Sequence, residues 1–155
     1  MDQNDARILD ILQSDAAISL DDLAAQTGLS AEDCRARVAQ MEKDGVILGR
    51  VTLLDPKKVG AEVTVFVAVT TPEHSQDWLD KFHAAVEDFP EVVEFYRMGG
   101  QVDYLLRVVV PDIESYDRFY KKLISSVTLK DVSSTFAIEQ IKFTTRLPLE
   151  GLTGG

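Results

Sequence analysis

Two Ser-x-x-Asp sequences stand eleven residues apart near the start of the chain, at Ser19–Asp22 and Ser30–Asp33. A serine in this pattern accepts a hydrogen bond from a free backbone N–H at a helix start, and the acidic residue three positions later completes the cap. Two helix starts at this spacing leave room for one short helix, 20–26, and a tight turn. Gly28 lies in that turn and can adopt the left-handed conformation that ends the short helix. The sequence therefore predicts two helices joined by a sharp turn.

The flanking residues extend this pair of helices into a larger module. Apolar residues at helical spacing predict an earlier helix that Asp2 caps and that ends at Ser14. The second helix of the pair is expected over 31–44 and ends at Gly45. The next segment, VILGRVTLLD (46–55), has the β-rich composition of a short hairpin or wing. Three helices and a wing form a winged helix-turn-helix, which reads DNA with the last of these helices.

A pattern of strand, helix and strand occurs twice in the second half of the chain. Each copy joins an apolar strand, a proline and a helix with aromatic residues along one face to a further strand. The expected elements are strands at 63–70, 92–98, 102–110 and 132–143, and helices at 75–88 and 112–126. Two βαβ units in tandem give the βαββαβ order of a ferredoxin-like domain. The predicted fold class is therefore α+β, with an N-terminal winged helix-turn-helix and a C-terminal ferredoxin-like domain.

The second face of the predicted sheet needs a cover. Both helices of a βαββαβ domain lie on one side of its sheet. The strand sequences VTVFVAV (63–69) and YLLRVVV (104–110) nevertheless carry apolar residues at both alternating sets of positions. That pattern is typical of strands covered on two faces. A second copy of the chain is the simplest cover, so the sequence predicts a dimer formed through the sheets.

The chain carries a formal net charge of −10, from 26 acidic and 16 basic residues. Residues 1–50 hold ten acidic and five basic side chains, so no basic stripe accompanies the helix-turn-helix, although DNA-binding domains usually have one. The composition is globular, without a membrane-length apolar run or a secretion signal, which predicts a cytoplasmic location and no membrane partner. The single cysteine, Cys34, excludes an intrachain disulfide and is expected to be buried.

The helix expected over 31–44 has an inward and an outward face. At about 100° per residue, Cys34, Val38 and Met41 point inward. Arg35 and Gln40 are suited to base edges and Lys43 and Arg50 to phosphates, with an ordinary solvated surface as the alternative. The residues expected to meet DNA are Ser30, Glu32, Arg35, Ala36, Ala39, Gln40, Lys43 and Arg50.

Glu32 and Asp33, in the first turn of this helix, have two interpretations. They stabilise the helix start against its dipole and pair with Arg35 and Arg37 at i+3 and i+4. Alternatively, Glu32 accepts a hydrogen bond from a cytosine amino group. Because an acidic helix releases few counterions per monomer, the sequence predicts that tight DNA binding depends on an assembly of several reading heads.

Four segments, in their order along the chain, resemble the Lrp/AsnC family of bacterial and archaeal transcription regulators. They are LDILQSDAAISLDDLAAQTGLS, CRARVAQMEKDGVILGRVTLLDPKKVG, GGQVDYLLRVVVPDIESYDRF and IEQIKFTTRLPL. The resemblance implies binding to double-stranded operator DNA and dimers that assemble further into tetramers or octamers. The expected division is a DNA-binding domain at 1–50, a wing or linker at 51–61, a RAM domain for effector binding and oligomerisation at 62–149, and a flexible tail at 150–155.

The resemblance also implies an effector site, because family members bind amino acids between protomers near the loop before the third strand. That loop is 98–104 here, and it reads Gly100, Gln101, Val102, Asp103 where the family often has an acidic residue at the second position. With Gln101 in place of that acidic residue, the α-ammonium group of an amino-acid ligand lacks one charged partner, although Asp103 can supply another. Ser133, Ser134 and Thr135, at the start of the last strand, carry hydroxyl groups that can bind a ligand carboxylate. The alternative is that they are ordinary polar residues of an edge strand. The expected effector residues are Met98, Gly99, Gly100, Gln101, Asp103, Tyr104, Ser133, Ser134 and Thr135.

The leading function is a transcription regulator of amino-acid-related metabolism whose effector is of the amino-acid type. Two alternatives stay open: an enzyme similar to the sirohaem decarboxylases, and a helix-turn-helix kept only for protein contacts. Those enzymes use histidine around the second and third strands, where this chain has Tyr96 and Arg97 but no histidine. His74 and His83 are expected at the surface. No catalytic residue, metal site or cofactor is expected.

Overall fold

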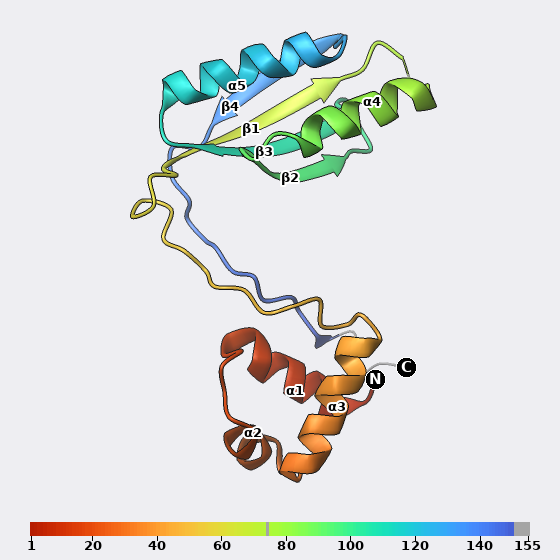
Figure 1. Cartoon of the computed structure of the whole chain (residues 1–155), viewed down its shortest axis with the longest axis vertical. Helices are drawn as coiled ribbons and strands as arrows, with labels where there is room; N and C mark the ends of the chain where they lie inside the picture. The colour runs from red at the N-terminus through yellow and green to blue at the C-terminus, as the bar shows by residue number, and fades with distance from the viewer. Residues whose placement is uncertain (74, 151–155) are drawn as a thin grey trace. The chain divides into compact units, whose positions relative to one another are not determined.

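The computed structural model describes residues 1–73 and 75–150 (Figure 1). Contacts divide the described chain into two compact units, Met1–Thr52 with residues 142–150, and Leu53–Ile141. Residues 151–155 of the expected tail, and His74, lie outside the described residues. Residues 142–150 group with the first unit because the chain returns to it after it leaves the sheet.

The first unit contains the three helices that the sequence predicts. Their bounds are α1 (Gln3–Ser14), α2 (Leu20–Thr27) and α3 (Ala31–Lys43). Each begins at its expected cap, whose side chain accepts a hydrogen bond from a backbone N–H of the first turn: Asp2, Ser19 and Ser30. Gly28 has a φ of 78°, and its N–H donates to the carbonyl of Ala24 over 2.8 Å. The helix-turn-helix prediction is therefore confirmed.

Apolar side chains from all three helices meet in a small core. Its buried members are Ile8, Leu9, Leu23, Cys34 and Met41. Cys34 is completely buried, as expected, and its sulfur lies 3.5 Å from the Thr27 hydroxyl oxygen. Val38 packs against the same cluster, so the inward face predicted for α3 is confirmed.

The C-terminal segment is fastened to α1. The backbone N–H of Leu147 donates to the side-chain oxygen of Gln13 over 2.6 Å, and the Leu147 carbonyl accepts from the Gln13 amide over 3.2 Å. Arg146 forms an ion pair with Asp10 at 2.6 Å. Leu149 packs against the helical core. These contacts explain why the segment from Lys142 onward belongs to the first unit.

The hairpin expected at 46–55 does not form; these residues run through bends and irregular backbone. The N–H groups of Val46 and Ile47 both donate to the carbonyl of Met41, at 2.9 and 3.1 Å, and so complete the end of α3. Residues 48–55 have strand-like composition but form no strand. A β-rich composition is therefore not sufficient for a strand, because strand propensity depends on the packing of side chains against their neighbours.

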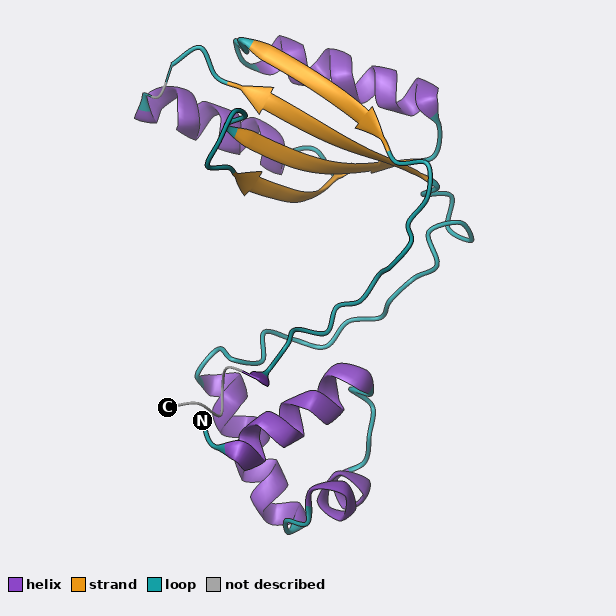
Figure 2. Cartoon of the chain, turned by 180° about the vertical axis from the view of Figure 1, so that it is seen from behind, coloured by secondary structure: helices purple, strands orange, loops and turns teal. Residues whose placement is uncertain are grey.

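The second unit is a four-stranded antiparallel sheet with two helices. The strands are β1 (Val63–Thr70), β2 (Val92–Arg97), β3 (Tyr104–Val110) and β4 (Asp131–Phe136), in the order β2-β3-β1-β4. The helices are α4 (Gln76–Glu87) and α5 (Ile113–Ser126). Both helices cover the same face of the sheet (Figure 2). This arrangement confirms the predicted βαββαβ order.

The last strand is shorter than the expected 132–143. Its pairing with β1 ends where Phe136 lies opposite Val65 and the N–H of Ala137 donates to the Thr64 carbonyl over 2.9 Å. Since β1 begins at Val63, residues beyond Ala137 have no further residue of β1 to pair with, and the chain leaves the sheet.

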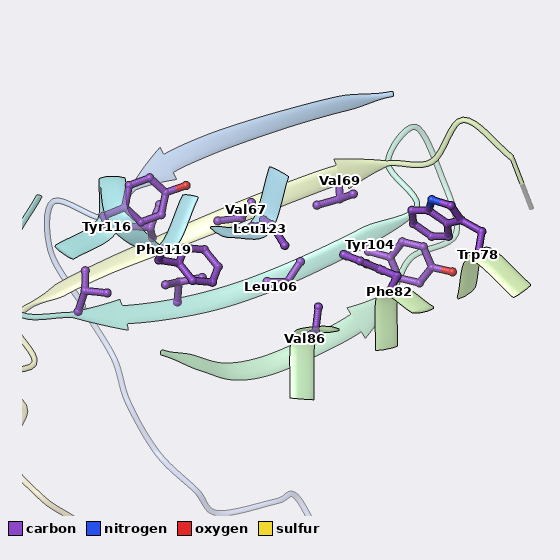
Figure 3. Packing of buried hydrophobic residues seen from close by; sticks show 13 residues of the cluster. Val67, Val69, Trp78, Phe82, Val86, Tyr104, Leu106, Tyr116, Phe119 and Leu123 are labelled. Carbon is purple, nitrogen blue, oxygen red and sulfur yellow. The ribbon is translucent and has the colours of Figure 1, made fainter. Parts of the chain in front are cut away.

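The main core lies between the sheet and its two helices. Every second residue of β1 and β3 points into it, including Val67 and Leu106, where Phe82 of α4 and Phe119 of α5 also point (Figure 3). The indole N–H of Trp78 donates to the carbonyl of Thr128 over 2.8 Å and so satisfies the polar edge of a buried ring. No helix in the described parts of the chain is long and apolar enough to cross a membrane.

The variant Gly28→Ala tests the turn of the helix-turn-helix. A Cβ at this position meets no atom within 4 Å, so the substitution acts through backbone conformation alone. We expect it to lower the free energy of unfolding by roughly 1–2 kcal/mol, the cost of a left-handed L-residue. Chemical denaturation measures this change. Gly49→Ala is the matched control, because its Cβ also enters open space but its φ is not left-handed; an equal loss in both variants would contradict this account.

Candidate DNA-reading face and effector loop

The outward face of α3 is open to solvent. All eight residues expected to meet DNA have exposed side chains: Ser30, Glu32, Arg35, Ala36, Ala39, Gln40, Lys43 and Arg50. Cys34 and Met41 on the opposite face are buried. Ser30 also caps the helix, since its hydroxyl accepts from the N–H of Asp33 over 3.0 Å. The helix therefore presents one continuous polar and small-residue surface.

Two of the expected DNA contacts are engaged within the chain. The Gln40 amide donates to Asp44 over 2.8 Å, and Arg50 forms an ion pair with Glu42 at 2.9 Å. Both pairs are exposed, so their net stabilisation is small and they exchange readily for other partners. The side chains of Gln40, on α3, and Arg50, beyond its end, therefore stay available to a ligand.

The expected ion pairs within α3 are not those that form. No ion pair joins Glu32 or Asp33 to Arg35 or Arg37 in the described residues. Arg37 instead contacts two carboxylates at the start of α1, Asp2 and Asp5. This prediction was wrong because it considered only neighbours on the same helix, whereas the fold brings a pair of acids from another helix within reach.

The loop before β3 is pinned at its base and exposed at its tip. The Met98 N–H donates to the Asp103 carbonyl over 2.8 Å, and the Asp103 N–H donates to the Val69 carbonyl over 3.0 Å. The Asp103 carboxylate also accepts from the N–H of Thr71 over 2.8 Å. Gly99, Gly100 and Gln101 at the tip are exposed, and so is Met98. Asp103 thus joins the loop to the residues that follow β1.

Tyr104 belongs to the core between sheet and helices. Its side chain is only 4% exposed, and its ring centre lies 5.2 Å from that of Phe82 and 5.6 Å from that of Phe95 (Figure 3). Only the backbone of Tyr104 borders the loop. The sequence grouped this residue with the effector residues by its place in the chain, but strand alternation directs its side chain beneath the helices.

The three hydroxyl residues of β4 point to different faces. Ser133 and Thr135 are exposed on the face away from the helices, opposite Ala68 and Phe66 of β1. Ser134 points the other way and shares a hydrogen bond with the Tyr116 hydroxyl, whose pKa is raised by burial. Val69 of β1 pairs with Tyr104 on one side and Val132 on the other. Consequently the loop and the start of β4 lie at the same end of the sheet.

The face of the sheet away from the helices, here called the open face, combines apolar side chains with one ion-pair cluster. Phe66 and Tyr96 are 39% and 50% exposed on it. Arg107 contacts Glu94 through Nε at 2.7 Å and through Nη2 at 2.6 Å, and the Tyr96 hydroxyl donates to Glu94 over 2.9 Å. The Arg107 guanidinium, followed by the Tyr96 hydroxyl, holds the pKa of Glu94 below its ordinary value of 4.5.

This depressed pKa predicts an acid-sensitive contribution from Glu94. The ion pair of Glu94 with Arg107 stabilises the fold above pH 4.5. That stabilisation is lost as the pH falls through the lower folded-state pKa of Glu94. We expect Glu94→Gln to reduce stability at neutral pH and to flatten the loss of stability below pH 4.5. Thermal melting across the acid range measures both effects. Parallel curves for the two proteins would show that Glu94 does not contribute.

The two units match known protein domains in the same order. Residues 1–47 match the winged helix-turn-helix DNA-binding model, and residues 64–147 match the Lrp/AsnC ligand-binding domain. A DNA-binding head joined to a ligand-binding domain defines a ligand-responsive transcription regulator. The chain belongs to the Lrp/AsnC family of transcriptional regulators.

Two relatives match the chain along almost its whole length. It is 53% identical to the glutamate uptake regulatory protein of Zymomonas mobilis over 149 residues, which cover 96% of this chain and 91% of the relative. It is 46% identical to the DNA-binding transcriptional activator DecR of Escherichia coli over 151 residues, with 97% and 99% covered.

Two solved structures share the fold over 98% of this chain and 99% of their own. An AsnC family regulator from Agrobacterium tumefaciens has a TM-score of 0.95 at 57% identity. A transcriptional regulator of Neisseria meningitidis, solved as a complex with L-Met, has a TM-score of 0.92 at 31% identity. The resemblance stated from the sequence is thereby confirmed.

Sequence reasoning missed two contacts in these sites. Arg37 on α3 reaches Asp2 and Asp5, and the available signal was the pair of acids three residues apart at a helix start. The backbone N–H of Thr71 donates a hydrogen bond to the Asp103 carboxylate, and no pattern of side chains in the sequence indicates such a backbone donor. His83 is exposed, as expected, with its ring 5.2 Å from that of Phe95.

Proposed function

We propose that this regulator controls genes of amino-acid-related metabolism, reading operator DNA with the outward face of α3 and changing its assembly when an amino-acid-type effector binds. The observation that carries the DNA-reading part is the exposure of all eight expected contact residues, six of them on a helix whose other face is buried, with Ser30 as its cap and Arg50 beyond its end. Arg35 and Gln40 reach base edges, and Lys43 and Arg50 bind phosphates. Ser30, Glu32, Ala36 and Ala39 complete the surface that follows the groove.

The effector part of the proposal rests on the loop at 98–104. Its tip is exposed. Its base is held by two hydrogen bonds, from the Asp103 N–H to the Val69 carbonyl and from the Thr71 N–H to the Asp103 carboxylate, so the loop has a defined shape before a ligand binds. Met98, Gly99, Gly100 and Gln101 bound the site, with Asp103 at its base and Ser133 near the same end of the sheet; Thr135 lies further along β4, opposite Phe66. The relative named for glutamate uptake and the neighbour bound to L-Met support an amino acid as the ligand class.

A second copy of the chain covers the open face in this proposal. Phe66 and Tyr96 leave apolar surface exposed there, and Leu105 and Val109 add partly buried apolar side chains. In a two-fold symmetric dimer the open faces of the two copies meet, and this apolar surface is buried in both. Such dimers, joined further into tetramers or octamers, place several α3 helices on one DNA segment. Analytical centrifugation that finds a stable monomer at micromolar concentration would overturn this part.

Assembly compensates for weak electrostatic attraction. Glu32, Asp33, Glu42 and Asp44 lie on α3 or at its end, against three cations, and Arg37 is already paired with α1. Each protomer therefore neutralises few DNA phosphates. High affinity for DNA then comes from several helix-turn-helix units that are linked in one assembly.

This argument predicts weak binding to one half-site and strong binding to several half-sites spaced by whole helical turns of DNA. Linked sites gain roughly 10²–10⁴ in avidity. Gel-shift titrations of fragments with one, two and four half-sites measure the gain. If one half-site binds as tightly as the phased array, assembly-dependent reading is wrong.

Removing Lys43 tests the phosphate contacts. We expect Lys43→Ala to weaken binding to specific and unrelated DNA alike and to lower the slope of log affinity against log salt by about one. Lys81→Ala is the matched control, because Lys81 is equally a surface lysine but lies on α4. An unchanged salt slope in Lys43→Ala would remove Lys43 from the proposed interface.

The effector is tested by a pull-down of genomic DNA fragments with the purified full chain, repeated with each common amino acid. One amino acid, or a few related ones, is expected to change the recovered fragments. Recovery of the same fragments under every condition contradicts amino-acid control, and failure to recover any fragment at low salt contradicts DNA reading itself.

A further inference from the structure

Arg37 joins α3, the helix proposed to read DNA, to the start of α1. Its Nη1 lies 3.1 and 2.9 Å from the two carboxylate oxygens of Asp2, and 2.7 Å from an oxygen of Asp5. One guanidinium group thus bridges two carboxylates from a helix that is 32 or more residues away in the sequence. Charge-assisted hydrogen bonds of this length are directional as well as strong.

The two carboxylates are themselves held in place. Asp2 accepts from the N–H of Asp5 over 2.9 Å, and Asp5 accepts from the N–H of Asp2 over 2.8 Å, which forms a reciprocal capping box at the start of α1. Neither acid can turn away without exposing a backbone donor of that helix. Arg37 therefore binds a preformed pair of acceptors rather than two mobile side chains.

The other contacts of α3 do not define its rotation equally well. Cys34, Val38 and Met41 pack against the first-unit core through apolar surface, and that attraction has no preferred direction. Cys34 is small and Met41 is flexible, so this surface tolerates small rotations of the helix. The bridge from Arg37 adds directional contacts on the flank between the buried and the exposed face, with its side chain 32% exposed.

We propose that Arg37 is a positioning residue for DNA reading: it sets the rotation and tilt of α3, and hence the direction of Arg35, Ala36 and Ala39, and it does not itself neutralise phosphate. This inference rests on the proposed reading of DNA by α3. A cation on a recognition helix is ordinarily assigned to the DNA backbone. Here its acceptors are supplied by the protein.

The two roles predict opposite signs when the acids are changed. Asp2→Asn keeps a good helix cap and removes a negative charge. If Arg37 positions α3, this variant weakens the bridge and lowers specific affinity. If Arg37 serves as a phosphate contact, the same variant frees the guanidinium, removes local repulsion of DNA and raises affinity. Asp5→Asn makes the same distinction from the second acceptor.

The experiment measures full-chain binding to a fragment carrying phased half-sites recovered by the genomic pull-down, and to a scrambled fragment of equal length, at several salt concentrations. For Arg37→Met we expect at least about a tenfold loss of affinity for the specific fragment, which corresponds to about 1.4 kcal/mol. Binding to the scrambled fragment and the salt slope are expected to stay unchanged. A slope lower by about one, with equal losses on both fragments, would show phosphate contact and overturn the proposal.

Arg118→Met is the matched control, because Arg118 pairs with Glu114 on α5 at 2.8 Å and the substitution removes the same charge from the second unit. If circular dichroism shows that Arg37→Met is unfolded, Asp2→Asn and Asp5→Asn decide between the two roles, because the roles predict opposite changes in affinity for the specific fragment. Loss of specific binding in Lys43→Ala together with wild-type specificity in Arg37→Met would reject the positioning role and leave DNA reading intact. Absence of binding by the wild-type chain would instead reject the proposed function.

Discussion

The second unit depends on the burial of every second side chain of β1 and β3 beneath α4 and α5. Val65, Val67 and Val69 are completely buried on that side, and the alternation of a strand then directs Phe66 and Ala68 to the opposite face. The open face is therefore a direct consequence of forming the core. Because it remains partly apolar, the proposed dimer, in which a second copy covers it, would link the folding of one chain to the assembly that the proposed DNA binding requires.

In the first unit, α1 connects the functional parts. Its start holds α3 through Asp2 and Asp5, its middle contributes Ile8 and Leu9 to the core, and its last turns hold the C-terminal segment through Asp10 and Gln13. In our proposal, the first of these contacts orients the outward face of α3. The net charge of −10 is less of an obstacle than it first suggests, since part of the acid serves as caps and as partners for Arg37 and Arg146.

Local signals in the sequence predicted the helices, the turn and the strand order because each signal acts over a few residues. Ser19 and Ser30 cap the backbone beside them, and Gly28 relieves a steric conflict within one residue. The errors involve distant partners. A strand over 46–55 does not form, β4 ends where β1 offers no further partner, and the partner of Arg37 lies on another helix. Tyr104 and Ser134 were assigned to the effector site by position in the chain, whereas their strand faces direct them into the core side of the sheet.

The sequence by itself determined the class of this protein: a helix-turn-helix followed by βαββαβ, in the order of the Lrp/AsnC family, with the inward and outward faces of the reading helix correctly distinguished. Only the tertiary structure decided which charged groups are paired, that Asp103 ties its loop to Thr71, and that the C-terminal segment returns to α1. The physical reason is that periodicity and capping are local properties of the backbone. Ion pairs and loop anchors depend on which residues folding brings within a few ångströms.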